Sequence, residues 1–87
     1  KFGEGFHYYV EVTVIPEPEL GRRKCEMYYT VDGAKRKYYL IEFYVQDEEN
    51  LVTAVDEMLE VVKKQMDWEI MIADIERDAE AAWEDAE

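Results

Sequence analysis

The chain has 87 residues, of which 48% are hydrophobic, 14% aromatic and 37% charged, and its formal net charge is −12. This length accommodates one small domain spanning residues 1–87, and the hydrophobic content excludes a disordered chain. The charge is unevenly distributed, since residues 1–45 hold seven acidic and seven basic side chains, whereas residues 46–87 hold fifteen acidic and three basic ones. Direct binding of nucleic acid by the second half is therefore excluded, because its carboxylates repel phosphates.

The chain contains one cysteine, Cys25, so no intramolecular disulfide forms. A lone thiol is typical of a reducing compartment. The sequence has no run of about 20 apolar residues, the length that a membrane-spanning helix needs, and no signal-peptide pattern. We therefore expect a cytoplasmic protein, including one that acts in an infected host cell, without a membrane partner.

The first predicted strand covers about residues 6–15. Its even-numbered positions are all apolar and its odd-numbered positions are mixed, which is the period of a half-buried strand. Pro16 and Pro18 are expected to end this strand, because proline has no amide proton to donate to a ladder. Residues 16–23 are then expected to form a loop.

Two further strands are predicted at about residues 25–31 and 37–45, with a turn at Asp32-Gly33, because aspartate and glycine tolerate the positive φ angles of tight turns. These strands form a hairpin, and the first strand completes a three-stranded antiparallel β-meander. Strict alternation divides the side chains of the third strand between two faces. One face holds Tyr39, Ile41, Phe43 and Val45, and the other holds Tyr38, Leu40, Glu42 and Tyr44.

Helical periodicity indicates helix over about residues 48–66 and 68–86, with Asp47 as the first N-cap. The two apolar stripes point about 130° apart on a continuous helix, and neither glycine nor proline separates them. We favour two helices packed on the sheet, because a stripe with two tryptophans is costly to expose. The alternative is one long helix whose second stripe forms a homodimer interface. That stripe contains Trp68, Ile72, Ile75, Ala79 and Trp83. The predicted fold class is α+β, in the order β-β-β-α-α.

Residues suited to catalysis or metal binding are few. His7 is the only histidine, and one histidine with one cysteine supplies neither a zinc site nor a Cys-His nucleophile pair. Carboxylate pairs such as Asp74 and Asp78 share one helix face, without the glycine-containing loop of calcium sites or the opposed walls of a glycosidase cleft. We therefore expect no enzymatic activity, no cofactor and no metal.

Two basic triplets, at residues 22–24 and 35–37, flank the second predicted strand. Either could contact phosphate, but their expected role is to balance the acidic helices and to protect the strand ends. The tyrosines come mostly as adjacent pairs, so each pair places one ring on each face of the sheet. The face away from the helices is then a candidate partner-binding surface. Its expected members are Tyr9, Tyr28, Tyr38 and Tyr44, together with Leu40.

The second helical segment carries carboxylates opposite its apolar stripe. Like charges four residues apart cost a few tenths of a kcal/mol per pair, so this acidity carries a penalty. A solubilising surface is the simplest interpretation, but the size of the excess and its confinement to one half favour binding to a basic protein. The predicted contact residues are Asp67, Glu69, Asp74, Asp78, Glu80 and Glu84.

The first functional hypothesis is an inhibitor that occupies the basic nucleic-acid channel of a nuclease. Carboxylates four residues apart on a helix lie about 6 Å from each other, close to the phosphate repeat along a strand, so they can substitute for phosphates. In size, charge and mixed strand–helix composition, the chain resembles small acidic phage proteins that block restriction or CRISPR enzymes.

The second hypothesis is an antitoxin that neutralises a basic toxin. Three strands followed by residues 46–55 opening a helix resemble HicB-type antitoxins, although the loop characteristic of that family does not follow residues 15–17. The third hypothesis is a structural domain that dimerises through the tryptophan-bearing stripe, with the acidity providing solubility.

Overall fold

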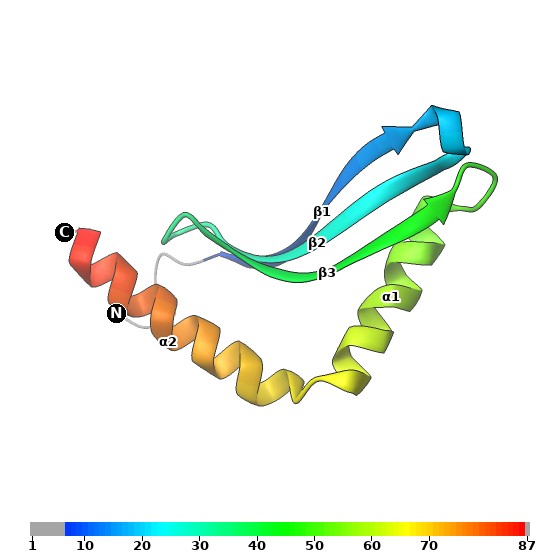
Figure 1. The fold of residues 1–87 in the computed structure, drawn as a ribbon. Coiled ribbons are helices and arrows are strands. Elements are labelled where there is room, and N and C mark those ends of the chain that lie inside the picture. Colours follow the sequence, from blue (N-terminus) through cyan, green and yellow to red (C-terminus); the bar gives the residue numbers. More distant parts are fainter. Residues whose placement is uncertain (1–6, 87) are drawn as a thin grey trace.

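The computed structural model describes the backbone of residues 7–86 and the side chains of residues 7–82. Three strands form one antiparallel sheet in the order β1-β2-β3, and two helices follow it in sequence. The predicted α+β class and element order are confirmed (Figure 1). The elements are β1 (Tyr8–Glu17), the short 3₁₀ helix η1 (Pro18–Leu20), β2 (Arg22–Val31), β3 (Arg36–Gln46), α1 (Leu51–Gln65) and α2 (Trp68–Ala86).

The first hairpin is longer than its sequence indicates. The prediction that Pro16 ends the first strand is wrong, since β1 continues to Glu17 and β2 already begins at Arg22. Pro16 is tolerated because β1 is an edge strand, where the position without an amide proton can face away from the sheet. The expected loop over residues 16–23 shrinks to η1 and Gly21, whose φ of 65° closes the connection.

The second hairpin contains a β-bulge. Met27 pairs with Ile41 whereas Tyr28 pairs with Tyr39, so Leu40 is an extra residue on β3. Beyond an extra residue, the alternation of side chains between the two faces changes phase. The faces predicted from strict alternation therefore cannot hold along the whole of β3.

Because of this change of phase, three side chains lie on the opposite face of the sheet from the one predicted. Tyr38 and Leu40 lie on the side of the helices, and Tyr39 lies on the opposite side, where it is 57% exposed. Phe43 and Val45, on the other side of the bulge, are buried as predicted. Alternation cannot reveal a bulge that no glycine or proline marks, and this explains the error.

The connection between β2 and β3 lies at the predicted turn. The Lys35 amide donates to the Asp32 carbonyl at 3.0 Å. The residue with a positive φ is Lys35, at 53°, and not Gly33. A lysine in this conformation carries a steric cost that a glycine would avoid.

The N-cap of α1 is Asn50 and not Asp47, which corrects the predicted start of this helix. The Asn50 side-chain oxygen accepts a hydrogen bond from the Thr53 amide at 3.0 Å, and its carbonyl accepts one from the Ala54 amide. Asp47 instead donates its amide to the Gly21 carbonyl at 3.0 Å, which fixes it at the end of the sheet.

Two separate helices are present, as favoured from the apolar stripes. Helix α1 ends at Gln65, and Met66 takes an extended conformation with φ −108° and ψ 153°. Helix α2 begins at Trp68, with a first backbone hydrogen bond from the Met71 amide to the Asp67 carbonyl. The break rotates the two helices relative to each other, so both apolar stripes can face the sheet.

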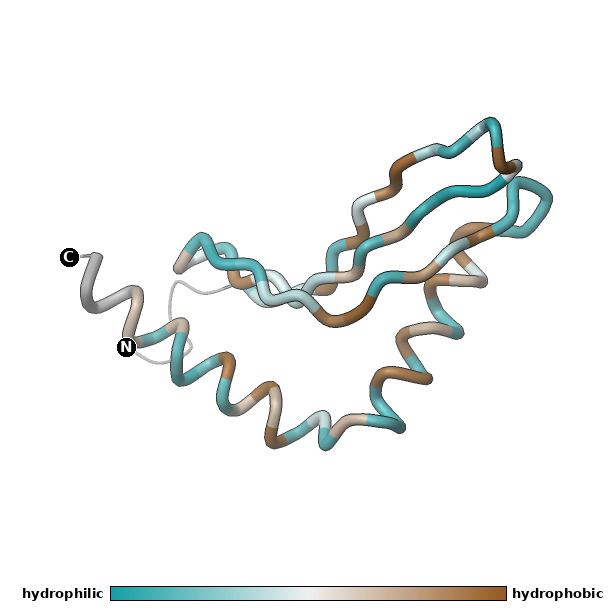
Figure 2. The backbone as a smooth tube through the Cα atoms, viewed as in Figure 1, coloured by the Kyte–Doolittle hydropathy of each residue, from teal (hydrophilic) through white to brown (hydrophobic). Residues whose placement is uncertain are grey.

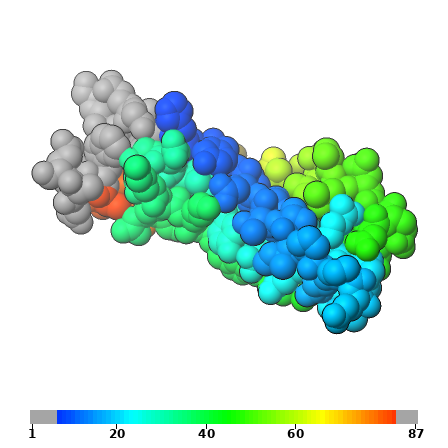
Figure 3. All heavy atoms as spheres, turned by 90° about the horizontal axis from the view of Figure 1, so that it is seen from above, coloured from blue at the N-terminus to red at the C-terminus, as the bar shows by residue number. Residues whose placement is uncertain are grey.

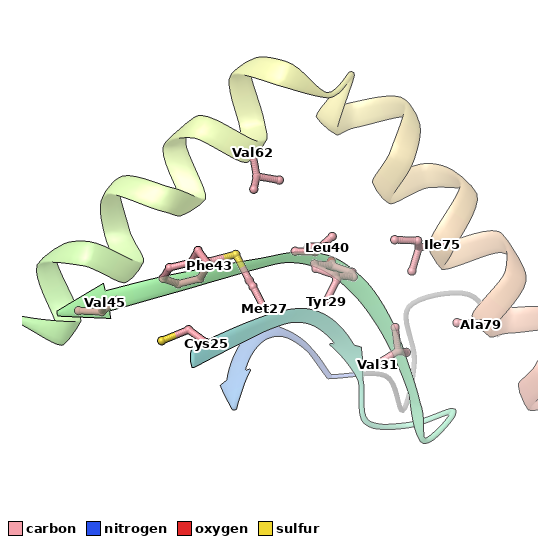
Figure 4. Packing of buried hydrophobic residues seen from close by; sticks show 10 residues of the cluster. All are labelled: Cys25, Met27, Tyr29, Val31, Leu40, Phe43, Val45, Val62, Ile75 and Ala79. Carbon is pink, nitrogen blue, oxygen red and sulfur yellow. The ribbon is translucent and has the colours of Figure 1, made fainter. Parts of the chain in front are cut away.

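The core lies between the sheet and the two helices, which cover the same face of the sheet (Figures 1 and 4). Helix α1 contributes Val62, and α2 contributes Ile75 and Ala79, all pointing toward the strands. Trp68 and Ile72 of the second stripe pack against this core. The rings of Trp68 and Tyr29 meet in a T-shaped contact, with their centres 6.1 Å apart. The strands supply the remaining buried residues, Cys25, Met27, Tyr29, Val31, Leu40, Phe43 and Val45.

The molecule is elongated. Its extents are 46 × 26 × 15 Å and its radius of gyration is 15.1 Å, compared with about 12 Å for a compact domain of this length. Hydrophobic and polar residues alternate along both helices (Figure 2). Within the described residues, no helix is both long enough and apolar enough to cross a membrane. The elongated shape gives the chain a large surface for its size.

Candidate functional site

The charged side chains on the sheet pair with one another between strands, and Glu11 of β1 reaches across β2 to Lys37 of β3. These ion pairs are Glu11–Lys37 (2.6 Å), Glu17–Arg22 (2.7 Å) and Lys24–Glu42 (3.3 Å). The hydrogen bond to Glu11 raises the pKa of Lys37, and the hydrogen bond to Glu42 raises that of Lys24. The sheet therefore neutralises most of its own charge.

The helices present carboxylates of a different kind. We call the exposed residues Asp56, Glu57, Asp67, Glu69 and Asp74 the acidic helical face. Asp74 pairs with Arg77 on its own helix at 3.2 Å, just as the exposed Glu60 of α1, which is outside this set, pairs with Lys63 at 3.8 Å. The other four residues of the face have no ion pair within the described residues. Because the opposite sides of both helices pack on the sheet, these carboxylates point away from the core. The face is therefore available to a partner.

Three of the six predicted contact carboxylates belong to this face: Asp67, Glu69 and Asp74. Asp56 and Glu57 were not predicted, although the stripe of α1 that begins at Leu51 already places them opposite the core. The signal that identifies them is the helical spacing of α1, which places both about a third of a turn or more from its apolar stripe.

Asp78 has a structural role that the sequence did not indicate. Its carboxylate accepts hydrogen bonds from the Arg36 guanidinium at 3.2 Å and from the Tyr38 hydroxyl. Burial and this hydrogen bond to Asp78 raise the pKa of Tyr38. Asp78 therefore links α2 to β3, and half of its side chain remains exposed, at 54%.

Glu80 is half-buried rather than fully exposed. The Tyr8 hydroxyl has a raised pKa because of burial and of the nearby negative charges of Glu76 and Glu80. Glu80 thus faces the start of β1 and not open solvent alone. The predicted contact at Glu84 lies outside the described side chains, as does Trp83.

The second candidate surface is the outer sheet face, which we define by Tyr9, Tyr28, Tyr39 and Tyr44. Tyr9 and Tyr44 are 45% and 44% exposed, and the Tyr28 and Tyr39 rings meet edge to face at 5.9 Å. The predicted patch contained Tyr38 and Leu40, and this part of the prediction is wrong because the bulge turns both toward the helices. Tyr39 takes the place of Tyr38.

Ion pairs and cation–π contacts occupy the spaces between these tyrosines. The Arg22 guanidinium lies 4.1 Å from the centre of the Tyr44 ring, and Lys37 is held by Glu11 beside Tyr9 and Tyr28. The outer sheet face is therefore a mixed aromatic and charged surface without net charge of one sign. It suits contact with a protein better than attraction of a charged partner from a distance.

The basic triplets serve the sheet more than the helices. Arg23 donates to the carbonyls of Gln46 and Glu49 at 3.0 and 2.9 Å, which holds the segment that leads into α1. Within the described side chains, one basic residue of these triplets pairs with a carboxylate of α1 or α2. This residue is Arg36, which pairs with Asp78. The expectation that the triplets balance the acidic helices is therefore met at one position.

The two residues considered for chemistry occupy ordinary positions. His7 is exposed at the start of β1. Cys25 is fully buried in the core, and burial raises the pKa of its thiol, which keeps it protonated and unreactive. In the described part of the chain, no three histidine, cysteine, aspartate or glutamate side chains are grouped closely enough to hold a metal ion.

Two shallow hollows mark the surface at opposite ends of the sheet. One, of about 260 Å³, lies beside the β2–β3 turn between Tyr9 and Lys37, and the other, of about 320 Å³, lies over residues 16–20. The first hollow is lined on one side by the basic residues 35–37, and the second is lined by Glu17 and Glu19 together with Pro16, Pro18 and Leu20.

Comparisons of this chain with models of protein families, with curated proteins and with solved structures gave no match. The function therefore has to be argued from the two surfaces described above.

Proposed function

We propose that this protein is a binding module that inhibits a basic partner by presenting carboxylates in place of phosphates, with a restriction or CRISPR-type nuclease as the first candidate partner. The observation that supports this proposal is the uncompensated charge of the acidic helical face. Four of its five carboxylates have no ion pair among the described residues, whereas the carboxylates of the sheet have close cations.

Such a face accelerates association with a basic channel, because charges of opposite sign attract over about 10 Å at moderate ionic strength. The long dimension of the molecule, 46 Å, corresponds to about 13 base pairs of duplex at about 3.4 Å each. The acidic helical face runs from Asp56 on α1 to Asp74 on α2, which at about 1.5 Å per residue spans at most about 30 Å, or about 9 base pairs. Its size therefore suits the nucleic-acid channel of an enzyme.

The proposal also implies a location. A nuclease that defends a bacterial cell works in the cytoplasm, where the reduced, buried Cys25 is stable. We therefore propose that this protein acts in the cytoplasm of the cell that contains its partner.

The experiment measures DNA cleavage by purified restriction and CRISPR-type nucleases, and RNA cleavage by a small basic ribonuclease of the toxin type. A mimic is expected to inhibit when it is added before the substrate and to inhibit much less when it is added afterwards. Inhibition should weaken steeply as salt rises, because screening shortens the electrostatic attraction. Inhibition of the ribonuclease alone would favour an antitoxin. If no enzyme associates with the protein at low salt, the proposal is wrong.

A pair of charge-matched variants separates the position of the charge from its amount. The test variant changes Asp56, Glu57 and Glu69 to lysine, and the control variant changes Glu19, Asp32 and Glu48 to lysine. All six residues are exposed, so each variant raises the net charge equally without disturbing the core. Only the test variant is expected to lose inhibition.

A third variant tests the outer sheet face, with Tyr9, Tyr39 and Tyr44 changed to serine. Under the proposal this variant continues to inhibit, because the helices carry the attraction. Loss of inhibition here, with full inhibition by the helix variant, would move the site to the outer sheet face and contradict nucleic-acid mimicry.

A further inference from the structure

One hydrogen bond defines the direction of the backbone groups along β1. The Asp32 amide donates to the His7 carbonyl at 2.9 Å, next to the paired residues Tyr8 and Val31, so His7 and Asp32 form a hydrogen-bonded pair. In an antiparallel ladder, such pairs alternate with pairs that are not hydrogen-bonded. The odd-numbered residues of β1 therefore bond to β2, and the even-numbered residues direct their amides and carbonyls away from the sheet. Pro16 is even-numbered, in agreement with its missing amide proton.

Among the residues that the structure describes, no strand pairs with the outer edge of β1. The sheet order places β1 at one side, and Figure 3 shows it running uncovered across the face that is seen from above. Along this strand Tyr9, Val14 and Ile15 are 45%, 37% and 42% exposed. Edges are protected by bulges, charges or proline. The other edge strand, β3, has a bulge and begins with Arg36 and Lys37, whereas β1 has Glu11 in its middle and Pro16 and Glu17 only at its end. Ten-residue β1 pairs with β2 without a register shift, so its outward backbone groups follow one another without interruption up to Pro16.

We propose that β1 pairs antiparallel with β1 of a second copy of this chain, around a twofold axis at Val12, to form a continuous sheet across both copies. The twofold axis must pass through a residue and not between two residues. An axis between two residues would pair a residue whose amide and carbonyl face outward with one whose amide and carbonyl face β2. The choice of residue then depends on hydrogen bonds and side chains.

The hydrogen bonds favour Val12 over Thr13. With the axis at Val12, four outward amides per chain find carbonyls, which gives about eight hydrogen bonds between the copies. With the axis at Thr13 the number falls to about six, because Pro16 then faces Val10, and Pro18, beyond the end of β1, faces Tyr8. An axis at Glu11 would place two glutamates directly opposite each other, where like charges destabilise a sheet.

The side chains favour the same register. The axis at Val12 places Tyr9 opposite Ile15 of the second copy, so the two most exposed apolar side chains of β1 cover each other. It places Val10 opposite Val14, and it places Glu11 opposite the uncharged Thr13. This register contains no pair of like charges, and cross-strand aromatic and β-branched pairs stabilise antiparallel sheets. The edge is therefore complementary to itself, which identifies a second copy of the chain as its occupant.

The charge of the whole chain opposes this pairing from a distance. A twofold axis perpendicular to the sheet places the helices of both copies on the same side, so their carboxylates repel. Added salt screens this repulsion, and the dimer is expected to become tighter as salt rises. The proposed inhibitory binding has the opposite salt dependence, so failure of one proposal is distinguishable from failure of the other.

Sedimentation equilibrium of the full chain tests the pairing at low and high salt. A monomer–dimer equilibrium that tightens with salt is expected. The variant Val12→Pro should weaken the dimer roughly tenfold or more, because it removes the central amides of the ladder. The monomer of this variant should fold, because the backbone nitrogen of residue 12 faces away from β2, as the nitrogen of Pro16 does. Circular dichroism checks the folding. A chain that stays monomeric up to about 1 mM, or a Val12→Pro variant that dimerises like the parent, would overturn the proposal.

Disulfide trapping tests the register, in a Cys25→Ala background that removes the native thiol. With the axis at Val12, the variant Val12→Cys brings two cysteines directly opposite each other, with Cα atoms about 5.5 Å apart. The matched control Val10→Cys lies on the same face of the strand, but its two cysteines would be offset by four residues, about 13 Å. Efficient covalent dimerisation of Val12→Cys alone is expected. Equal trapping of both variants would show random collision and contradict the register.

Discussion

The sheet and the helices of this protein handle charge in opposite ways. On the sheet, Lys37 and Lys24 lie 2.6 and 3.3 Å from carboxylates of other strands. On the helices, Asp56 and Glu69 are exposed and have no cation partner among the described residues. Both regions contribute to the same core, so packing does not require this difference. The acidity is therefore a property of one surface, the acidic helical face, and not of the fold.

The charges of the two regions also differ in what they contribute to stability and to recognition. Exposed ion pairs contribute about 0–1 kcal/mol each, so the pairs on the sheet chiefly keep its surface neutral. Unpaired carboxylates on a helix cost a few tenths of a kcal/mol per neighbouring pair. The helices bear this cost while the sheet avoids it, and this favours a binding role for the acidic helical face.

The largest effect is expected where the helices meet the sheet. Val62 is 1% exposed and is the buried residue through which α1 enters the core. Val62→Asp should lower the free energy of unfolding by about 3–5 kcal/mol, because an unpaired charge would be buried. Val52 on the same helix is 69% exposed, and Val52→Asp should change stability by less than about 0.5 kcal/mol. Urea unfolding measures both, and equal losses would mean that α1 is not anchored through Val62.

The next effect tests the two faces of the sheet at adjacent residues. Tyr38→Ser should cost about 2 kcal/mol, because the ring packs against the core, and its hydroxyl bonds to Asp78 on α2. Tyr39→Ser should cost about 0.5 kcal/mol, since Tyr39 is 57% exposed on the outer sheet face. Thermal unfolding compares the two variants. A reversed order of stability would show that β3 has no bulge.

A smaller effect is expected from the acidic residue that links the two regions. Asp78→Ala removes the hydrogen bonds from Arg36 and Tyr38, and it should cost about 1 kcal/mol. Asp74 pairs with Arg77 on α2 itself, so Asp74→Ala should change stability by less than about 0.5 kcal/mol. Denaturant titration of the two variants provides the comparison. Equal costs would mean that α2 is not held through Asp78.

The smallest effect per group is expected from alkaline pH, and it arises in the sheet. Burial raises the pKa of Tyr29 above the ordinary 10.0 and that of Cys25 above 9.0, and burial followed by the contact with Asp78 raises that of Tyr38. The folded state thus holds these protons more tightly than the unfolded state. Stability should be constant below pH 9 and should fall as pH rises through 9 to 10 and beyond. Melting temperatures measured from pH 7 to 11 check this, and Tyr38→Phe should reduce the slope. A melting temperature that rises over this range would contradict it.

Local sequence patterns predicted most of the fold because they depend on neighbouring residues. Alternation identified all three strands, and the 3.6-residue period identified two helices whose break no glycine or proline marks. The same patterns failed where distant contacts decide. Pro16 remains in β1 because, among the described residues, no strand lies beyond that edge, and Leu40 is an extra residue of β3 opposite Met27 and Tyr28 of β2.

The candidate site shows the same division. The carboxylates at Asp67, Glu69 and Asp74 followed from helical spacing alone. Asp78 has identical spacing, yet it contacts Arg36 and Tyr38, which lie 42 and 40 residues away in sequence. No periodicity within α2 can distinguish a carboxylate that reaches the sheet from one that faces solvent.

The order of elements, the acidity of the second half and the apolar stripes follow from local composition and spacing, so they can be predicted from the amino-acid sequence. Among the described residues, the fold determines which carboxylates of the acidic half have no ion pair, which tyrosines face outward and which edge of the sheet is unpaired. These depend on the register between strands and on the docking of α2, where a shift of one residue exchanges the two faces of a strand.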